Sequence, residues 1–74
     1  MSGDSYCVAL FQSVNHTLLA EKLLKEAGIA IKMIPVPRNL SSDCGVCIRF
    51  SPRDLRALQD ALAGRVETGG IHPL

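Results

Sequence analysis

The order in which apolar patterns follow one another is the feature that most constrains the fold of this 74-residue chain. Residues Tyr6 to Phe11 form an unbroken apolar run of strand length. A helical pattern follows and ends at Gly28, a residue that takes a positive φ without cost. Alternating apolar residues then predict a second strand at Ile29 to Ile34 and a third at Val46 to Phe50.

The first helix has a predicted start and a predicted buried face. Ser13 or Asn15 suits the N-cap, because a short side chain with an oxygen atom can accept hydrogen bonds from first-turn N–H groups. We expect helical spacing to turn four residues toward the core: Leu19, Leu23 and Ala27, with Ala20 beside them.

The run Ser51-Pro52-Arg53-Asp54 predicts the start of a second helix. Ser51 suits the N-cap, Pro52 the first helical position, and Asp54 a position from which it can bond back to the cap. The predicted apolar stripe consists of Leu55, Leu58 and Leu62, and Gly64 is expected to end the helix. A short last strand is expected at residues 65–68, which makes 5–68 the ordered core and 69–74 a C-terminal tail.

These elements predict a single α+β domain over residues 1–74, with the ferredoxin-like βαββαβ order. Two helices would cover one face of a small antiparallel sheet. Right-handed crossovers would make the first two strands parallel, with the third strand between them. The first strand is apolar on both faces, so we expect it to be central and partly shielded, or else to belong to an open sheet face that pairs with a second copy in a homodimer.

Composition excludes several classes of function. A net charge of +1, the absence of tryptophan and only three aromatic residues argue against nucleic-acid binding. Three cysteines do not form the even, dense set of a secreted disulfide scaffold, so a reducing cytoplasm is the expected compartment. No apolar run approaches the roughly 20 residues of a membrane span, and the first residues lack a signal-peptide pattern, so no contact with a membrane is expected.

The segment Cys44-Gly45-Val46-Cys47 concentrates most of the reactive chemistry of the chain. Two thiols at this spacing can exchange sulfur, switch redox state or hold half of a metal site. The predicted topology brings the start of the third strand to the end of the sheet where the first helix begins. We therefore expect Cys44 to lie close to Ser13, Asn15 and His16, where a helix N-terminus stabilises a thiolate.

Other side chains can assist this chemistry or be structural. His16 is a candidate for moving the proton of Cys44, since its ordinary pKa is near 6.5, although it can equally be a first-turn surface residue. Cys47 is either a resolving thiol or an inert strand residue, and Cys7 is expected in the core. The candidates for holding an anionic adduct or an acidic patch of a partner are Arg38, Arg49, Ser42 and Gly45.

A zinc site is a further alternative, but the sequence does not favour one. Cys44 and Cys47 with His16 and His72 would complete a Cys₂His₂ set. The second closely spaced pair of ligands that makes such sites recognisable is missing. We therefore expect no metal and no cofactor.

Several segments together resemble one family. They are a phenylalanine followed by polar residues and His16, then Ala20-Glu21-Lys22 with Leu24-Lys25, Ile34-Pro35-Val36-Pro37-Arg38, Ser41-Ser42 and Cys44-Gly45. The chain from about Tyr6 to Phe50 resembles the Se/S carrier protein-like family of small bacterial proteins. The resemblance implies that Cys44 carries sulfur or selenium as a persulfide-type adduct. The second thiol, Cys47, is not a general part of the family pattern.

Three hypotheses follow from these residues and this resemblance. In the first, the protein is a carrier that accepts sulfur or selenium on Cys44 from a cysteine desulfurase or another donor and delivers it to an acceptor protein. In the second, it is a small dithiol redox protein that uses Cys44 and Cys47 together. In the third, it is an interaction or dimerisation module whose cysteines are incidental.

Overall fold

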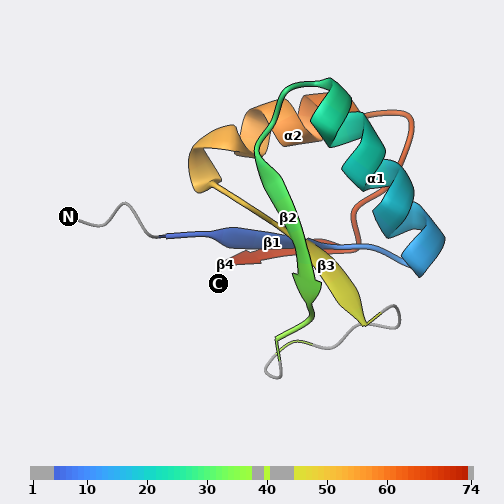
Figure 1. Cartoon of the computed structure of the whole chain (residues 1–74), viewed down its shortest axis with the longest axis vertical. Helices are drawn as coiled ribbons and strands as arrows, with labels where there is room; N and C mark the ends of the chain where they lie inside the picture. Colours follow the sequence, from blue (N-terminus) through green and yellow to red (C-terminus); the bar gives the residue numbers. More distant parts are fainter. Residues whose placement is uncertain (1–4, 38–39, 41–44, 74) are drawn as a thin grey trace.

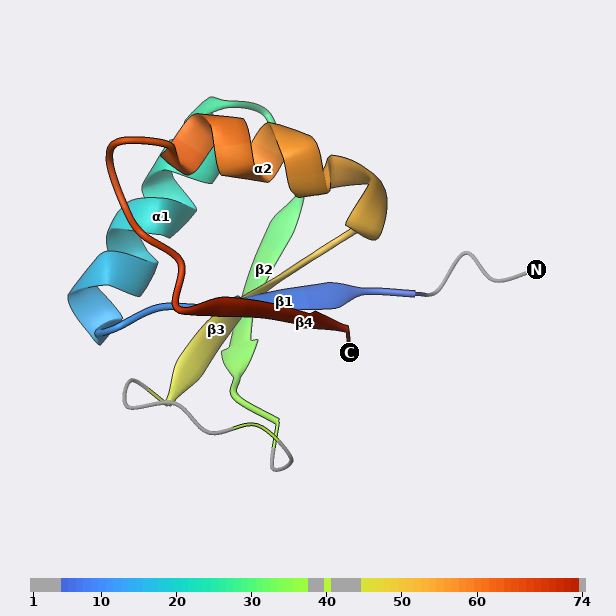
Figure 2. The same ribbon diagram turned by 180° about the vertical axis from the view of Figure 1, so that it is seen from behind.

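The computed structural model describes residues 5–37, 40 and 45–73, and their fold is the predicted one. The elements follow in the order β1 (Cys7–Leu10), α1 (Val14–Glu26), β2 (Ile31–Pro35), β3 (Val46–Phe50), a 3₁₀ turn η1 (Pro52–Asp54), α2 (Leu55–Leu62) and β4 (Gly70–Pro73). Both helices lie on one side of a four-stranded sheet (Figure 1). The same two layers are visible from behind (Figure 2).

The sheet has the strand order β2-β3-β1-β4, and every neighbouring pair is antiparallel. Because β1 and β2 both run antiparallel to β3, they are parallel to each other with β3 between them, as predicted. This is the ferredoxin-like α+β arrangement. The expectation that β1 is central and shielded is confirmed, since Val8 and Ala9 on its opposite faces have no exposed surface.

The main core lies between the sheet and the two helices. Ala9, Ile48 and Phe50 supply the sheet side, and α2 contributes Leu58 and Leu62, two of the three residues of its predicted stripe. The third, Leu55, packs at the edge of the same core. Burying these aliphatic and aromatic side chains is the main source of stability in so small a domain.

Helix α1 starts and stops as predicted. Ser13 is the N-cap, and its hydroxyl oxygen accepts a hydrogen bond from the His16 backbone N–H. At the other end, Gly28 has a φ of +79°. Its N–H bonds to the Lys25 carbonyl and the Ile29 N–H bonds to the Leu24 carbonyl, which is the Schellman pattern of hydrogen bonds.

The buried face of α1 agrees only in part with the predicted one, since Ala20 is buried and Leu23 packs against the core. Thr17, Ala20 and Leu24 are buried, whereas Leu19 is 44% exposed and Ala27 is exposed. The apolar residues of this helix cover more than one face, so spacing alone did not identify the face in contact with the sheet. Thr17 fits the core because its hydroxyl donates to the Ser13 carbonyl oxygen at 3.0 Å, which satisfies the buried polar group.

The boundaries of β2 and of the second helix also differ in detail. Strand β2 begins two residues later than predicted and includes Pro35, which is tolerated because β2 is an edge strand. Helix α2 is preceded by the 3₁₀ turn, closed by a hydrogen bond from the Asp54 N–H to the Ser51 carbonyl. Neither Ser51 nor Asp54 makes the side-chain capping bond that was predicted.

The last strand lies further along the chain than predicted. Residues 65–68 form no strand, and β4 occupies Gly70–Pro73, within the segment assigned to the tail. Val66 is buried in the core and brings the chain back to the sheet, and the Gly69 N–H bonds to the Leu10 carbonyl at 2.6 Å. Pro73 is acceptable here for the same reason as Pro35, since β4 is the other edge.

The corrected face of α1 gives a direct test. Leu24→Ala should lower the free energy of unfolding by about 2–5 kcal/mol, because Leu24 is buried and its loss leaves a cavity. Leu19→Ala removes the same atoms from a side chain in contact with solvent, and should cost less than about 1 kcal/mol. Urea unfolding followed by circular dichroism measures both values. A larger loss for Leu19→Ala would contradict the helix orientation described above.

Candidate functional site

The base of the β2–β3 loop is held by one backbone hydrogen bond. The Val36 N–H donates to the Gly45 carbonyl oxygen at 3.1 Å, next to the pairing of Pro35 with Val46. Gly45 has a φ of +74°, a conformation that other residues adopt only at a cost of roughly 1–2 kcal/mol. A Cβ atom built at Gly45 would meet no atom of the described residues within 4 Å, apart from its own chain neighbours.

Four of the predicted site residues belong to this loop. Cys44, Arg38 and Ser42 lie outside the described residues, and Gly45 is the first described residue after them. The expected closeness of Cys44 to Ser13, Asn15 and His16 therefore stays a prediction. Its topological basis is present, because β3 begins at the end of the sheet where β1 leads into α1 (Figures 1 and 2).

Cys47 is buried on the sheet face that points away from the helices. Its side chain has no exposed surface and clusters with Val8 and Leu10, and its thiol donates a weak hydrogen bond to the Pro35 carbonyl oxygen at 3.9 Å. Val36 and Leu40 pack against this cluster. Residues around the loop therefore cover part of the sheet face that would otherwise be open to water.

His16 lies in the first turn of α1 and is exposed. Its Nδ1 is 2.7 Å from the Ser13 hydroxyl oxygen, which also accepts from the His16 backbone N–H. Either the hydroxyl donates a hydrogen bond to Nδ1 or Nδ1–H donates one to the hydroxyl oxygen, depending on the tautomer of the ring. In either case Ser13 orients the ring and leaves Nε2 as the ring nitrogen available for proton transfer.

Arg49 lies away from the loop. It is four residues beyond Gly45 along β3, a distance of about 13 Å at the usual rise of a strand. Its guanidinium carbon stands 4.3 Å from the centre of the Tyr6 ring, a cation–π contact. The structure thus brings Gly45 and Cys47 together at one end of β3 and places Arg49 toward the other end.

The described residues show no metal centre. Within residues 5–37, 40 and 45–73, no three histidine, cysteine or carboxylate side chains are grouped so that they could hold an ion. Cys7 is half-buried against the main core, in agreement with the predicted core role. Across the same described ranges, neither α1 nor α2 is long and apolar enough to cross a bilayer.

The match to a family model decides the identity of the chain. The model described as putative Se/S carrier protein-like matches residues 6–73, nearly the whole sequence. The chain belongs to this family. No curated protein and no solved structure matches the chain. The family match extends past Phe50, where the sequence resemblance ended, and includes α2 and β4.

Sequence reasoning left out several residues that the structure brings together. Leu40 covers the cluster around Cys47, although it stands in a polar loop sequence. Tyr6, Lys32 and Arg53 line a cleft with Arg49 at the far end of the sheet. The alternation of β2 and β3 could have placed Lys32 and Arg49 on one face, but only the strand register shows that they are direct neighbours.

The N-cap contact predicts a difference between two neighbouring variants. Ser13→Ala should lower the free energy of unfolding by about 1 kcal/mol, because the first turn of α1 loses its side-chain acceptor. Asn15→Ala is the matched control, since Asn15 makes no capping bond, and it should leave stability nearly unchanged. Chemical denaturation measures both, and equal losses would count against the cap at Ser13.

The burial of Cys47 predicts a large difference in thiol reactivity. In the folded protein, iodoacetamide should modify Cys47 roughly a hundredfold more slowly than in about 8 M urea. Modification requires the side chains that cover Cys47, Val8 and Leu10 to move apart. Peptide mapping by mass spectrometry gives the rate at each cysteine in one experiment. Modification of Cys47 at the unfolded rate in the native protein would show that its burial is not maintained in solution.

Proposed function

We propose that this protein is a sulfur or selenium carrier that holds the chalcogen as a persulfide-type adduct on Cys44. Membership of the Se/S carrier family over residues 6–73 is the observation that carries the proposal. Cys44 stands within the matched range and is followed by Gly45, an exposed residue with a positive φ. The partners are a cysteine desulfurase or another donor, and an acceptor protein, in the cytoplasm.

The loading step is a thiol exchange. The Cys44 thiolate attacks the terminal sulfur of a persulfide on the donor, so that a new S–S bond forms on Cys44 and the donor's S–S bond breaks. The donor cysteine leaves as a thiolate. In delivery, a thiolate of the acceptor attacks the same terminal sulfur and Cys44 returns to the thiolate form, so the complete transfer needs no external oxidant or reductant.

His16 is proposed to move the proton of the Cys44 thiol before loading. Its Nδ1 is hydrogen-bonded to Ser13, and in the tautomer where Nδ1–H donates to the serine hydroxyl oxygen, Nε2 is free of hydrogen and can accept a proton. The exposed first turn of α1 also supplies N–H groups that favour a nearby anion. Arg38, Ser42 and Gly45 are proposed to hold the anionic adduct at the loop.

The burial of Cys47 supports a carrier that works with one thiol. A resolving cysteine must reach the inner sulfur of the adduct, expel hydrosulfide and form a disulfide with Cys44. Cys47 is buried beside Val8 and Leu10 with Val36 and Leu40 packed against this cluster, and its side chain points to the sheet face rather than along the loop. We therefore place Cys47 in the structure of the loop base rather than in the transfer step.

Mass spectrometry of the intact protein tests the proposal. After incubation with a cysteine desulfurase and cysteine, or with selenide and an oxidised thiol, the wild type should gain one sulfur or one selenium atom. Dithiothreitol should remove it, because it attacks the adduct as any thiol does. Cys44→Ser should abolish the gain, whereas Cys47→Ser and Cys7→Ser, the matched controls, should retain it.

Two other results would favour the alternatives. Loss of two hydrogens, mapped to Cys44 and Cys47 and absent in Cys47→Ser, would favour a dithiol redox protein. An unchanged mass in every condition would favour an interaction module. Whether the protein forms a homodimer stays a prediction that sedimentation velocity can test in the same samples.

A further inference from the structure

The charges of the described residues are distributed unevenly between the two layers. The sheet face opposite the helices, called the open face here, carries Tyr6, Val8, Leu10, Lys32, Ile34, Cys47, Arg49 and His72. None of these side chains is a carboxylate. The described carboxylates lie on α1, η1, α2 and the loop after it: Glu21, Glu26, Asp54, Asp60 and Glu67. Counting the described residues alone, the open face therefore carries a net positive charge, although the whole chain is close to neutral.

The basic side chains of the open face are aligned across the sheet. Lys32 on β2 pairs directly with Arg49 on β3, Arg49 pairs with Val8 on β1, and Val8 pairs with His72 on β4. Directly paired residues of an antiparallel sheet have Cβ atoms about 4.5–5.5 Å apart. Lys32 and Arg49 are thus two positive charges held side by side by the strand register.

This pair is unfavourable in the free protein. Like charges directly opposite each other destabilise a sheet, and nearby carboxylates usually offset such a cost. Among the described residues, the ion pair shorter than 4 Å joins Lys25 and Glu21 on α1, and neither Lys32 nor Arg49 forms one. Tyr6 holds the Arg49 guanidinium through its ring face, which orients the charge without neutralising it.

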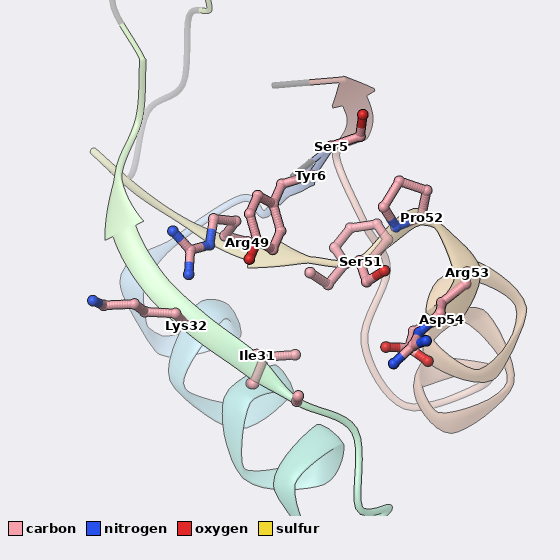
Figure 3. A pocket seen from close by; sticks show the side chains of 11 residues that line it. Ser5, Tyr6, Ile31, Lys32, Arg49, Ser51, Pro52, Arg53 and Asp54 are labelled. Atoms are coloured by element: carbon pink, nitrogen blue, oxygen red, sulfur yellow. The ribbon is translucent and has the colours of Figure 1, made fainter. Parts of the chain in front are cut away.

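A cleft of about 600 Å³ opens beside the pair. The starts of β1 and β2, the end of β3 and the η1 turn form its walls. Figure 3 shows Lys32 and Arg49 extending to the same side, with Tyr6 beside Arg49. Arg53 and Asp54 lie at the opposite rim, beyond Ser51. Among the described residues, the lining thus combines three cations with one carboxylate.

We propose that this cleft binds a small molecule through a doubly negative phosphate group placed between Lys32 and Arg49. A planar guanidinium can bond two phosphate oxygens at once, and the ammonium of Lys32 adds a second charge within reach of the same group. Bound phosphate would neutralise the repulsion between the two cations. Arg53 contributes further positive charge from the opposite rim.

The size and shape of the site favour a small molecule over a macromolecule. The volume is within the usual range of ligand sites, roughly 300–1,000 Å³, and the residues come from four elements that converge on one hollow. A single-stranded nucleic acid would need free aromatic faces for its bases, and the face of Tyr6 is covered by Arg49.

This site is separate from the carrier loop. The cleft includes the end of β3 at Phe50, whereas the loop joins β3 before Val46, so the strand separates the two. The proposal goes beyond the carrier function and does not depend on it. Cys44→Ser should bind phosphate as the wild type does, so failure of one proposal leaves the other measurable.

Titration with inorganic phosphate, followed by amide chemical shifts in NMR spectra, tests the cleft. Ionic strength is kept constant with sodium chloride. We expect saturable shifts at Lys32, Arg49 and Ser51, and binding roughly tenfold weaker in Lys32→Gln and in Arg49→Gln, since each removes one charged contact. Lys22→Gln on α1 is the matched control because it makes the same change of charge away from the cleft, and its affinity should equal that of the wild type.

A second probe separates the possible sources of the phosphate group. Tighter binding of glycerol phosphate than of inorganic phosphate would indicate a phosphate ester as the ligand, and equal binding would indicate free phosphate. Both results support the proposal. Shifts spread evenly over the surface, equal weakening in Lys22→Gln, or a stronger response to a hexaglutamate peptide than to either phosphate would overturn it.

Thermal unfolding provides a readout that does not depend on chemical shifts. Phosphate should raise the Tm of the wild type, because a ligand that binds only the folded state stabilises it. The rise should be largely absent in Lys32→Gln, which itself should be no less stable than the wild type without phosphate, since it removes a like-charge pair. A lower stability of Lys32→Gln in phosphate-free buffer would contradict the unfavourable pairing.

Discussion

The pairing of β1 with β3 is the interaction on which the other features depend. It aligns Ala9 with Ile48 on the helix side and Val8 with Arg49 on the open face. A shift of β3 by one residue relative to β1 would turn Ile48 away from the helices and bring Arg49 into the core. Because Ala9, Ile48 and Phe50 are buried against α1 and α2, the core itself holds this register. The loop before β3 and the cleft after it are both positioned by that single alignment.

Much of the fold could be predicted because local chemistry and tertiary structure agree. Gly28 ends α1 with a positive φ, Ser13 caps its start, and the alternation of Val46, Ile48 and Phe50 identifies the buried side of β3. The topology followed from the order of elements and the handedness of crossovers. Each of these features is determined by a few neighbouring residues, so one sequence is enough to recognise it.

The remaining features depend on contacts between distant segments. The apolar residues of α1 allow more than one buried face, and the choice of Thr17, Ala20 and Leu24 depends on the surface of the sheet. Strand β4 combines glycine, histidine and proline, which predict a tail; pairing with β1 makes it a strand. The adjacency of Lys32 and Arg49 follows from a register that no local pattern contains. The loop thiol was found from spacing and resemblance, whereas the cleft needed the assembled sheet.

Strand β3 carries two kinds of environment on one face. Near its start, Cys47 is covered by apolar side chains, including Leu40, and has no exposed surface. Two residues later, Arg49 stands half-buried beside a second cation and a cleft. A strand is stiff over this length, so Gly45 at the base of the loop and Arg49 at the cleft keep a separation of roughly 13 Å. A partner proposed to meet the loop near Gly45 would therefore not displace the anion proposed for the cleft. In the two proposals taken together, the partner meets one end of this face and the anion the other, so the charge of the anion would change how an acidic or basic partner meets the face between them.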